Sequence, residues 1–499
     1  MAALGALQTL AFVHTAAWPL TIFTLALLVW RLDAASPRRA ALLGWCYGTA
    51  WLCAGVWWLF ISMHRYGGLP APLAGAAVFA LSAALSLYLA ATCAAYARWR
   101  RGTAFDVALF AALWLLAELA RGLIFTGFPW AASGYALVDS PLAALAPWVG
   151  VYGMGAVGAA LAAAIAATAA RLRPAPPGGL RRGPAWAPLA GPLVLVAAAA
   201  VAPRDFTQAA GDLRVVLLQT NVAQDEKFAA ERMPDTLAWV ARELRMAQAD
   251  LVVAPETAVP LLPDQLEEFA PGFWAALQAH FAQPGRAALV GVPMGDFERG
   301  YTNSVAGFSV APVYRYDKAH LVPFGEFIPR GFRWFTEMMN IPLGDFARGV
   351  ANTPSFIVGA QRVAPNICYE DLFGEELARR FAEPSSAPTV FANISNIGWF
   401  GNTAAIPQHL AISRLRTLEF QRPMLRATNT GATAVIDHQG RVTAQLAPYT
   451  AGVLKATVQG RSGSTPYAAW AALAGLWPLV LAALGAVGAA VALRRRAGA

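Results

Sequence analysis

Charged residues are scarce in this chain of 499 residues: Asp, Glu, Lys and Arg make up 13%, whereas hydrophobic residues make up 57%. A soluble globular domain normally carries about 25% charged residues. The scarcity is uneven, because charge is sparse before Asp205 and after Gly460 and ordinary between them. This distribution argues against a wholly soluble chain and predicts membrane spans that enclose one water-exposed domain.

Cysteine and histidine are also few, with four cysteines and six histidines in the whole chain. Cys46, Cys53 and Cys93 lie in apolar segments, where a cysteine usually serves as a small hydrophobic residue. Cys368 is the one cysteine of the predicted soluble domain, so no disulfide can form within that domain. We therefore expect neither a metal centre nor a cofactor, and a reactive thiol is the notable option.

Apolar stretches long enough for membrane helices alternate with arginine-rich connections. They lie near 1–14, 17–30, 40–62, 72–96, 104–126, 144–170, 186–202 and 467–493. Most reach the roughly 20 residues that a span needs. The first thirty residues fit either one tilted helix or two spans. We predict a membrane bundle of six or seven helices at 1–202, a soluble domain at 203–465, and a last span with a basic tail at 466–499.

The formal net charge of +9 raises the possibility of nucleic-acid binding. However, the arginines gather in short connections near 31–39, 98–101 and 171–182 and at 494–496, beside apolar segments. The positive-inside rule explains them as cytoplasmic loops, and we expect no nucleic-acid partner. All clusters then fall on one side of a multi-pass inner-membrane protein, and the soluble domain lies on the other side, in the periplasm of a Gram-negative cell.

Glu118 and Arg121 lie inside one predicted span, one helical turn apart. Ionisable residues at that depth are costly unless they are paired. The spacing favours a structural ion pair over a role in binding a substrate.

The soluble segment alternates apolar strands with amphipathic helices, which indicates an α/β domain with one large sheet or two packed sheets. Three strands deliver a chemically useful side chain at their ends, where α/β folds usually build their sites. Glu256 follows the apolar run that begins at Val252, Lys318 follows Tyr316-Asp317, and Cys368 follows Asn366-Ile367. These segments predict a carboxylate, an ammonium and a thiol at one sheet edge.

Such a trio can perform nucleophilic catalysis. Glu256 can take the thiol proton and return it to a leaving group, and Lys318 can stabilise a thiolate and an oxyanion. His320 and His409 compete weakly as bases, since neither has an orienting acid beside it in the sequence. Taken singly, such residues are more often a buried core cysteine, a helix N-terminal or surface carboxylate and a solvated lysine.

Several longer motifs resemble the nitrilase superfamily, and the apolipoprotein N-acyltransferase family in particular. They are Thr126–Trp130 in the membrane part, then Lys318–Pro329, Ile367–Glu370, Ser395–Gly401, and Gln408-His409 followed by Arg414, Arg416 and Glu419. The resemblance covers nearly the whole chain. It implies a membrane helix bundle with an inserted nitrilase-like αββα sandwich.

The resemblance also implies roles for single residues. Glu256 resembles the general base, Lys318 the oxyanion-stabilising lysine and Cys368 the nucleophile of a Glu–Lys–Cys triad. The residues that resemble substrate-binding or supporting positions are Glu326, Tyr369, Glu370, Trp399 and, more weakly, Asn303. Glu326 and Glu370 equally fit fold-stabilising carboxylates. Ile397 stands where the family usually has an acid, and we infer that this acid is structural.

The implied activity is acyl transfer from a phospholipid, phosphatidylethanolamine, to the N-terminal amine of a diacylglyceryl-cysteine in an apolipoprotein, by a monomeric enzyme through a Cys368 thioester. A membrane-tethered nitrilase-type amidase shares the triad and is the alternative. A transporter or binding scaffold is a third interpretation. The chain has few charges inside its predicted spans, which argues against transport. The aromatic, Met-rich segment 331–339 fits either a mobile arm that guides acyl chains or ordinary core.

Overall fold

The computed structural model describes residues 1–172, 184–332, 334 and 345–498, which form two compact units. The helical unit comprises Met1–Trp57, Gly75–Arg204 and Ala474–Ala499. The sheet unit comprises Trp58–Ala74 and Asp205–Leu473. The sequence-based boundaries near 202 and 465 stay a prediction about the membrane and soluble parts.

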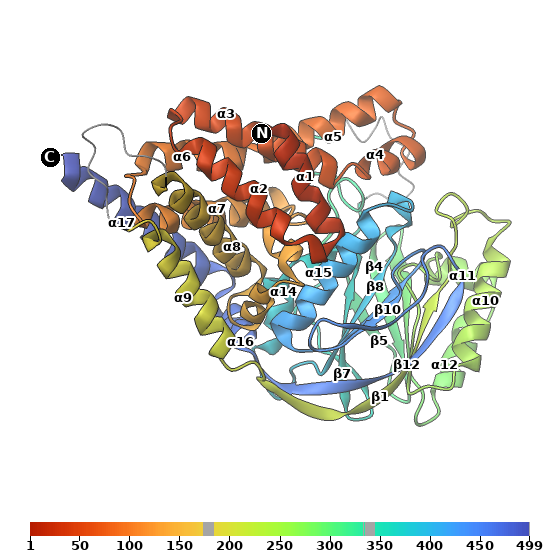
Figure 1. The fold of residues 1–499 in the computed structure, drawn as a ribbon. Coiled ribbons are helices and arrows are strands. Elements are labelled where there is room, and N and C mark those ends of the chain that lie inside the picture. Colours follow the sequence, from red (N-terminus) through yellow and green to blue (C-terminus); the bar gives the residue numbers. More distant parts are fainter. Residues whose placement is uncertain (173–183, 333, 335–344, 499) are drawn as a thin grey trace. The chain divides into compact units, whose positions relative to one another are not determined.

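The helical unit is built from apolar helices. They are α1 (Ala2–Val13), α2 (Pro19–Leu32), α3 (Pro37–Gly55), most of α5 (Ala71–Leu85), α6 (Leu87–Trp99), α7 (Phe105–Leu123), α8 (Ala146–Arg171), α9 (Ala187–Val201) and α17 (Trp477–Gly498) (Figure 1). Among the described residues, five helical segments are long and apolar enough to cross a membrane. A sixth results if α3 and the bent helix that follows it form one broken span. The chain is therefore integrated in a membrane.

The first thirty residues form two helices, not one tilted helix. α1 ends at Val13, a short 3-10 turn covers Thr15–Ala17, and α2 begins at Pro19. Proline is well placed at a helix start because its missing N–H would have no partner there. With 12 residues, α1 is too short to cross the hydrocarbon core alone.

The predicted ion pair is present in α7, where Arg121 Nη2 lies 3.3 Å from Glu118 Oε1 and both residues are buried. The Glu118 carboxylate also accepts hydrogen bonds from the Ser133 amide at 2.7 Å and the Ser133 hydroxyl at 2.8 Å. Arg121 donates to the Ala131 carbonyl at 2.9 Å. These contacts to protein groups fit a structural pair.

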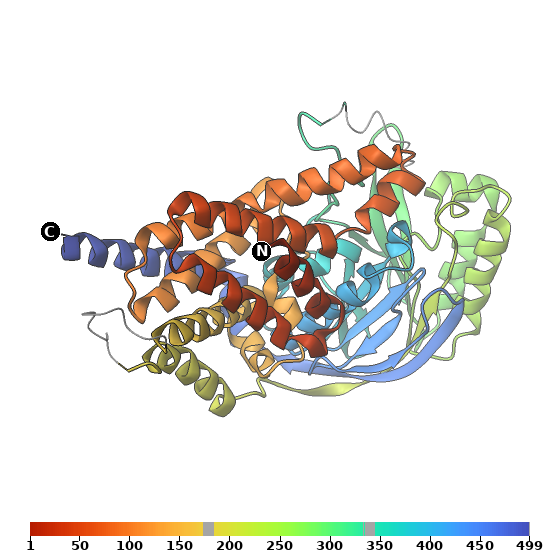
Figure 2. The same ribbon diagram turned by 45° about the horizontal axis from the view of Figure 1, so that its top comes forward.

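The sheet unit contains two six-stranded sheets, ordered β12-β1-β2-β3-β4-β5 and β11-β10-β9-β8-β7-β6. The first sheet consists of β1 (Thr207–Gln219), β2 (Leu251–Val253), β3 (Ala288–Asp296), β4 (Gly300–Phe308), β5 (Tyr314–Asp317) and β12 (Gly452–Gly463). The second consists of β6 (Phe356–Val358), β7 (Gln361–Ile367), β8 (Val390–Ser395), β9 (Met424–Thr428), β10 (Ala434–Ile436) and β11 (Val442–Gln445). Figure 2 shows the long strands β1 and β12 running side by side along one edge of this unit.

The sheets pack face to face, with helices on both outer faces. The buried side chains between them include Leu217 and Leu289 of the first sheet and Val390 and Leu425 of the second. α10 (Met233–Met246), α11 (Pro263–Phe269) and α12 (Phe273–Phe281) lie on the first sheet, and α14 (Gly374–Ala378), α15 (Ala405–Phe420) and α16 (Pro466–Ala474) lie on the second. The predicted αββα sandwich is confirmed.

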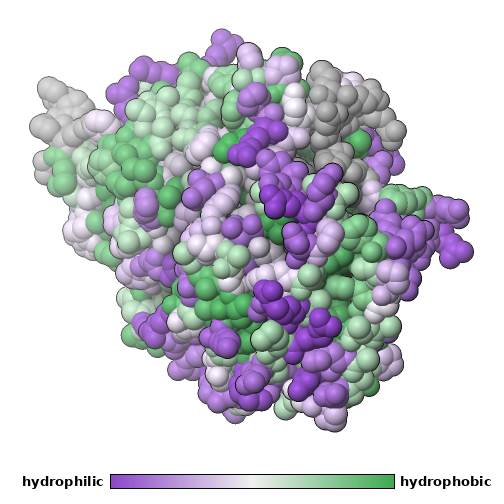
Figure 3. Space-filling view, turned by 90° about the vertical axis from the view of Figure 1, so that its right-hand side faces the viewer, coloured by the Kyte–Doolittle hydropathy of each residue, from purple (hydrophilic) through white to green (hydrophobic). Residues whose placement is uncertain are grey.

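Helix α10 shows how the sequence specifies these outer layers. Leu237, Val240 and Leu244 recur at helical spacing and are buried against the first sheet, while charged residues occupy the opposite face. Seen from the side that carries α10 and α12, hydrophilic side chains cover much of the surface, with smaller hydrophobic areas between them (Figure 3).

The central strands are parallel: β2 pairs with β1 and β3, and β8 pairs with β7 and β9. Such strands are covered on both faces, which explains their continuous apolar sequences. Their carboxyl ends meet at one edge of each sheet and carry the polar residues described next.

Candidate active site

The three predicted segments come from both sheets. Glu256 follows β2 and Lys318 follows β5 in the first sheet, while Cys368 directly follows β7 in the second. Lys318 Nζ lies 3.6 Å from Glu256 Oε1, and both side chains are almost completely buried. The thiol of Cys368 is close enough for Glu256 and Lys318 to shift its pKa. The fold thus brings the three groups together.

The Glu256 carboxylate is held by two donors from different sheets. Asn303 on β4 donates from Nδ2 to Oε1 at 2.7 Å, and the backbone N–H of Asn396, just after β8, donates to Oε2 at 2.7 Å. These two donors, one on each oxygen, fix the orientation of the carboxylate. Asn303, the weakest of the sequence matches, contacts the carboxylate directly.

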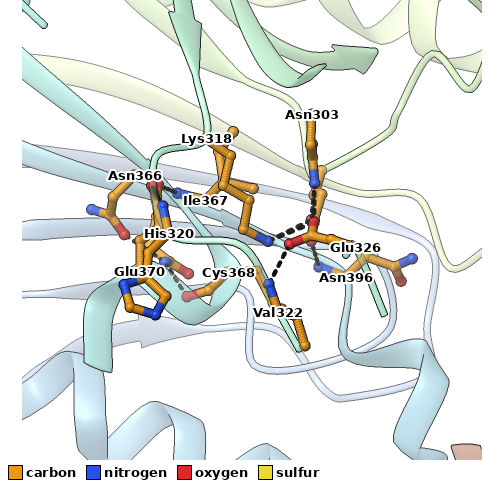
Figure 4. A network of polar contacts seen from close by, with 12 residues as sticks. Asn303, Lys318, His320, Val322, Glu326, Asn366, Ile367, Cys368, Glu370 and Asn396 are labelled. Carbon is orange, nitrogen blue, oxygen red and sulfur yellow. Dashed lines mark hydrogen bonds and ion pairs between the residues drawn. The ribbon is translucent and has the colours of Figure 1, made fainter. Parts of the chain in front are cut away.

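Glu326 is the second carboxylate of this cluster. Lys318 Nζ donates to its Oε1 at 2.8 Å, Asn303 Nδ2 donates to the same oxygen at 2.8 Å, and the Val322 amide donates to Oε2 at 2.8 Å. Figure 4 shows these groups converging on Glu326. Burial alone would lower the pKa of Lys318, but the Glu326 and Glu256 carboxylates outweigh it and raise that pKa, so the lysine stays charged.

Cys368 stands on a strained turn. Its φ is 51°, a left-handed conformation that is uncommon outside glycine, at the point where β7 passes into a short 3-10 helix. The Cys368 carbonyl accepts hydrogen bonds from Asn393 Nδ2 and from His409 Nε2, each at 3.2 Å. These contacts hold a backbone that would otherwise relax, and the side chain remains partly exposed.

The resting thiol is protonated. Burial raises the pKa of Cys368 to about 12, and the Glu256 charge adds to this effect while Lys318 opposes it. The sequence predicts that Lys318 stabilises a thiolate; in the substrate-free site burial, with the charges of Glu256 and Glu326, outweighs the effect of Lys318 on the thiol pKa. Thiol deprotonation therefore has to accompany attack on a substrate.

Glu370 joins the backbones that carry Lys318 and Cys368. Its Oε1 accepts from the amides of Ala319 at 2.7 Å and His320 at 3.1 Å, and its Oε2 accepts from the Ile367 amide at 2.7 Å. The Tyr316 hydroxyl also donates to this carboxylate. Glu370 thus ties β5 of one sheet to β7 of the other.

Both histidines have acidic partners, contrary to the expectation from sequence. His409 Nε2 lies 2.9 Å from Asp371 Oδ1, and His320 Nδ1 lies 3.0 Å from Glu376 Oε1. These acids follow Cys368 in the chain and are brought to the histidines by folding. His409 is completely buried and faces the Cys368 carbonyl, so it braces the turn and does not face the thiol.

The remaining predicted residues flank this cluster. The buried Tyr369 ring packs on Phe373 and His320, with ring centroids 5.2 and 5.7 Å apart. Ile397 is completely buried in an apolar cluster with Ile406, Ala432 and Cys368. An aliphatic side chain fills that place by packing, which fits a structural role for this position.

Trp399 lies beside a segment that sequence analysis assigned to the membrane bundle. This connecting segment, Trp58–Ala74, belongs to the sheet unit. The Tyr66 ring packs edge-on against Trp399 at 5.7 Å, and the Trp58 ring lies 4.3 Å from Phe400. Trp58 Nε1 also donates to Gln408 Oε1 at 3.0 Å. No local signal marks these contacts, because the segment reads as the end of an apolar span.

Most of the predicted arm at 331–339 lies outside the described residues. Of that stretch, Gly331, Phe332 and Trp334 are described, and the Phe332 ring packs edge-on against Phe324 at 5.4 Å. Among the described residues, no group of three or more His, Cys, Asp or Glu side chains is placed to hold a metal ion.

Comparison with known proteins places this chain in a family. The model of the apolipoprotein N-acyltransferase N-terminal domain matches residues 4–164, and the carbon-nitrogen hydrolase model matches residues 214–467. An apolipoprotein N-acyltransferase of Verminephrobacter eiseniae is 53% identical over 92% of this chain and 89% of its own. One from Ralstonia nicotianae is 46% identical over 100% and 94%.

The chain belongs to the apolipoprotein N-acyltransferase family. The predicted resemblance is confirmed, and family membership supports an N-acyltransferase over the amidase alternative. Among solved structures, a carbon-nitrogen hydrolase from Helicobacter pylori G27 covers 50% of this chain and 90% of its own, with 17% identity and a TM-score of 0.37.

Proposed function

We propose that the chain transfers a fatty acyl group from a membrane phospholipid, phosphatidylethanolamine, to the N-terminal α-amine of diacylglyceryl-cysteine in apolipoproteins. The names of its relatives and the two matching family models support this activity. The observation that carries the mechanism is the buried cluster of Glu256, Lys318 and Glu326 beside the strained, partly exposed Cys368.

In the first half-reaction, Cys368 Sγ attacks the ester carbonyl carbon while the S–H proton passes to Glu256. The carbonyl oxygen of the ester becomes the oxyanion of a tetrahedral intermediate, which Lys318 stabilises. The carbon–oxygen bond to the glycerol then breaks, and Glu256 returns the proton to the departing alkoxide. The products are an acyl thioester on Cys368 and a lysophospholipid.

In the second half-reaction, the acceptor α-amine, having lost its ammonium proton to solvent, attacks the thioester carbonyl. Glu256 accepts a proton from the attacking nitrogen, and the carbon–sulfur bond breaks. The departing sulfur takes that proton from Glu256, which restores the thiol and leaves an amide on the lipoprotein. This sequence is ping-pong covalent catalysis.

Glu326, Asn303, Tyr369, Glu370 and Trp399 support these steps in the proposal. Glu326 fixes the Lys318 ammonium, Asn303 fixes both carboxylates, and Glu370 holds the backbone just after Lys318 and just before Cys368. Trp399 and Tyr369 border the place where lipid would enter. We place the catalytic domain, 203–465, in the periplasm, on a monomeric multi-pass protein of the inner membrane, following the arginine distribution.

Mass spectrometry of purified enzyme incubated with phosphatidylethanolamine alone tests the mechanism. We expect one acyl mass on the peptide that contains Cys368, released by hydroxylamine, together with one equivalent of lysophospholipid. The matched controls are Cys368→Ala and Cys93→Ala, since Cys93 is buried among apolar helices of the other unit. Enzyme that acylates an apolipoprotein peptide without ever carrying this adduct would overturn the scheme. Hydrolysis of a small amide without lipid would favour the amidase.

A further inference from the structure

A second buried lysine adjoins the proposed base and has no part in the steps above. Lys227 is 5% exposed, and its Nζ donates a hydrogen bond to the backbone carbonyl of Glu256 at 2.9 Å. Among the described residues this is the single hydrogen bond of its ammonium group. Burying an ammonium group costs free energy unless nearby negative charge compensates it. Its position beside Glu256 therefore needs a physical explanation.

The basic composition of the chain makes this lysine conspicuous. Lys227, Lys318 and Lys455 are the only lysines among the 38 lysine and arginine residues. Two of the three are buried at this site, and Lys455 is exposed on β12. A lysine ammonium is a compact point charge that fits a small buried space, whereas the planar guanidinium of arginine needs several partners.

The segment that carries Lys227 is fastened to the site. After β1, Thr220 Oγ1 and the Val222 amide both donate to Asn429 Oδ1, at 2.7 and 2.9 Å. Gln224 Oε1 accepts from Asn396 Nδ2 at 2.9 Å, and the backbone amide of Asn396 binds the Glu256 carboxylate. Lys227 therefore reaches Glu256 from a segment bonded to the same residue that orients the carboxylate.

The carbonyl that Lys227 binds belongs to a tight turn. Thr257 has a φ of 52°, which is strained for a β-branched residue. On the other side, β3 approaches so closely that a Cβ on Gly291 would lie 2.3 Å from the Pro255 carbonyl oxygen. The Glu256 backbone is thus confined from β3 and anchored by the ammonium.

Charge gives Lys227 a second effect. Glu256 and Glu326 bring two negative charges to the cluster, and Lys318 offsets one of them. Burial lowers the pKa of Lys227 to about 8, while the charges of Glu256 and Cys368 raise it, so the three groups interact electrostatically. A charged Lys227 adds positive charge beside Glu256 and Cys368, which favours removal of the thiol proton.

We propose that Lys227 is a positioning residue for the proposed general base: its ammonium anchors the Glu256 backbone through the carbonyl, and its positive charge beside Glu256 and Cys368 favours deprotonation of Cys368. The proposal rests on the acyl-transfer function above. Lys227 acts through Glu256 and Cys368 and makes no contact with substrate.

Two variants separate the anchor from the charge. Lys227→Gln keeps an N–H donor for the Glu256 carbonyl and removes the charge, whereas Lys227→Met removes both. Lys455→Gln is the control for loss of one exposed lysine. The first measurement is the rate of Cys368 alkylation by iodoacetamide across a pH series, with full-length enzyme in detergent and no substrate. The second is kcat and KM for thioester formation from phosphatidylethanolamine.

We expect both Lys227 variants to shift the alkylation profile to higher pH, with a rate at about pH 8 that is roughly threefold or more below wild type. We also expect kcat to fall about tenfold or more at nearly unchanged KM, with Lys227→Met below Lys227→Gln. A Lys227→Gln enzyme with the wild-type alkylation profile and kcat would overturn the proposal. A wild-type enzyme that forms no thioester would overturn the proposed function. The alkylation measurement needs no substrate, so it would still test the role of Lys227.

Discussion

Lys318 forms its short ion pair with Glu326, at 2.8 Å between Nζ and Oε1, and lies 3.6 Å from the Glu256 carboxylate. The two carboxylates thus share one lysine unequally. Glu326 is the closer partner of the ammonium group, and Glu256 is held instead by Asn303 and the Asn396 amide.

This inequality predicts different effects of two isosteric substitutions. Glu256→Gln removes the proposed base, and we expect kcat for thioester formation to fall about 10²- to 10⁴-fold. Glu326→Gln leaves the base and removes the main partner of Lys318, and we expect a smaller loss. Single-turnover release of lysophospholipid measures both. Equal losses would contradict the assignment of separate roles.

Substrate-free enzyme should show the raised pKa of its thiol. Burial raises the pKa of Cys368 to about 12, so below that value the thiolate fraction grows about tenfold per pH unit. We expect the iodoacetamide rate at Cys368 to rise with that slope between about pH 7 and 9 without a plateau. The rate can be followed by peptide mass spectrometry, and a plateau near neutral pH would show a lowered pKa instead.

Glu370→Gln tests whether Glu370 braces the fold beneath the site. The glutamine amide supplies only one acceptor oxygen. Its NH₂ group faces backbone N–H groups that have lost their acceptor. We expect the free energy of unfolding to fall by about 1–3 kcal/mol and kcat to fall as well. Thermal unfolding measures the first effect. Glu383→Gln is the control, because Glu383 is exposed and its contacts lie at the surface. Wild-type stability in Glu370→Gln would remove the bracing role.

The connecting segment predicts an effect far from Glu256 in sequence. Trp58→Phe keeps an aromatic ring beside Phe400 and loses the hydrogen bond to Gln408. The loop with Phe400 begins at Asn396, which holds Glu256, so we expect kcat to fall several-fold, the equivalent of about 1 kcal/mol. Trp57→Phe is the matched control, since Trp57 is exposed. If both variants keep full activity, the segment does not position the loop.

A strand signal precedes each member of the proposed triad, and the family motifs made this assignment specific, because each signal taken singly is weak. The apolar runs before Glu256 and Cys368 predict buried strands, and their carboxyl ends are where α/β folds place side chains. The family motifs supplied the two-layer sandwich, because strand periodicity alone left one sheet or two open. The catalytic roles of these residues stay predictions.

Other parts of the site depend on tertiary contacts that no local pattern carries. Asp371 partners His409 across 38 positions, and the Asn396 amide binds Glu256 across 140. The raised pKa of the Cys368 thiol depends on burial and on the charges around it, which the spacing of residues in the sequence does not give. Lys227 offered one sequence signal, the rarity of lysine beside arginine, and the structure supplied its contact with Glu256.

Because Glu256 and Lys318 follow strands of one sheet and Cys368 follows a strand of the other, neither half of the sandwich contains all three members of the proposed triad. A newly made chain whose sheets have not yet closed would carry Cys368 without the proposed base and lysine beside it. The proposed acyl transfer would then begin only once the two sheets have closed.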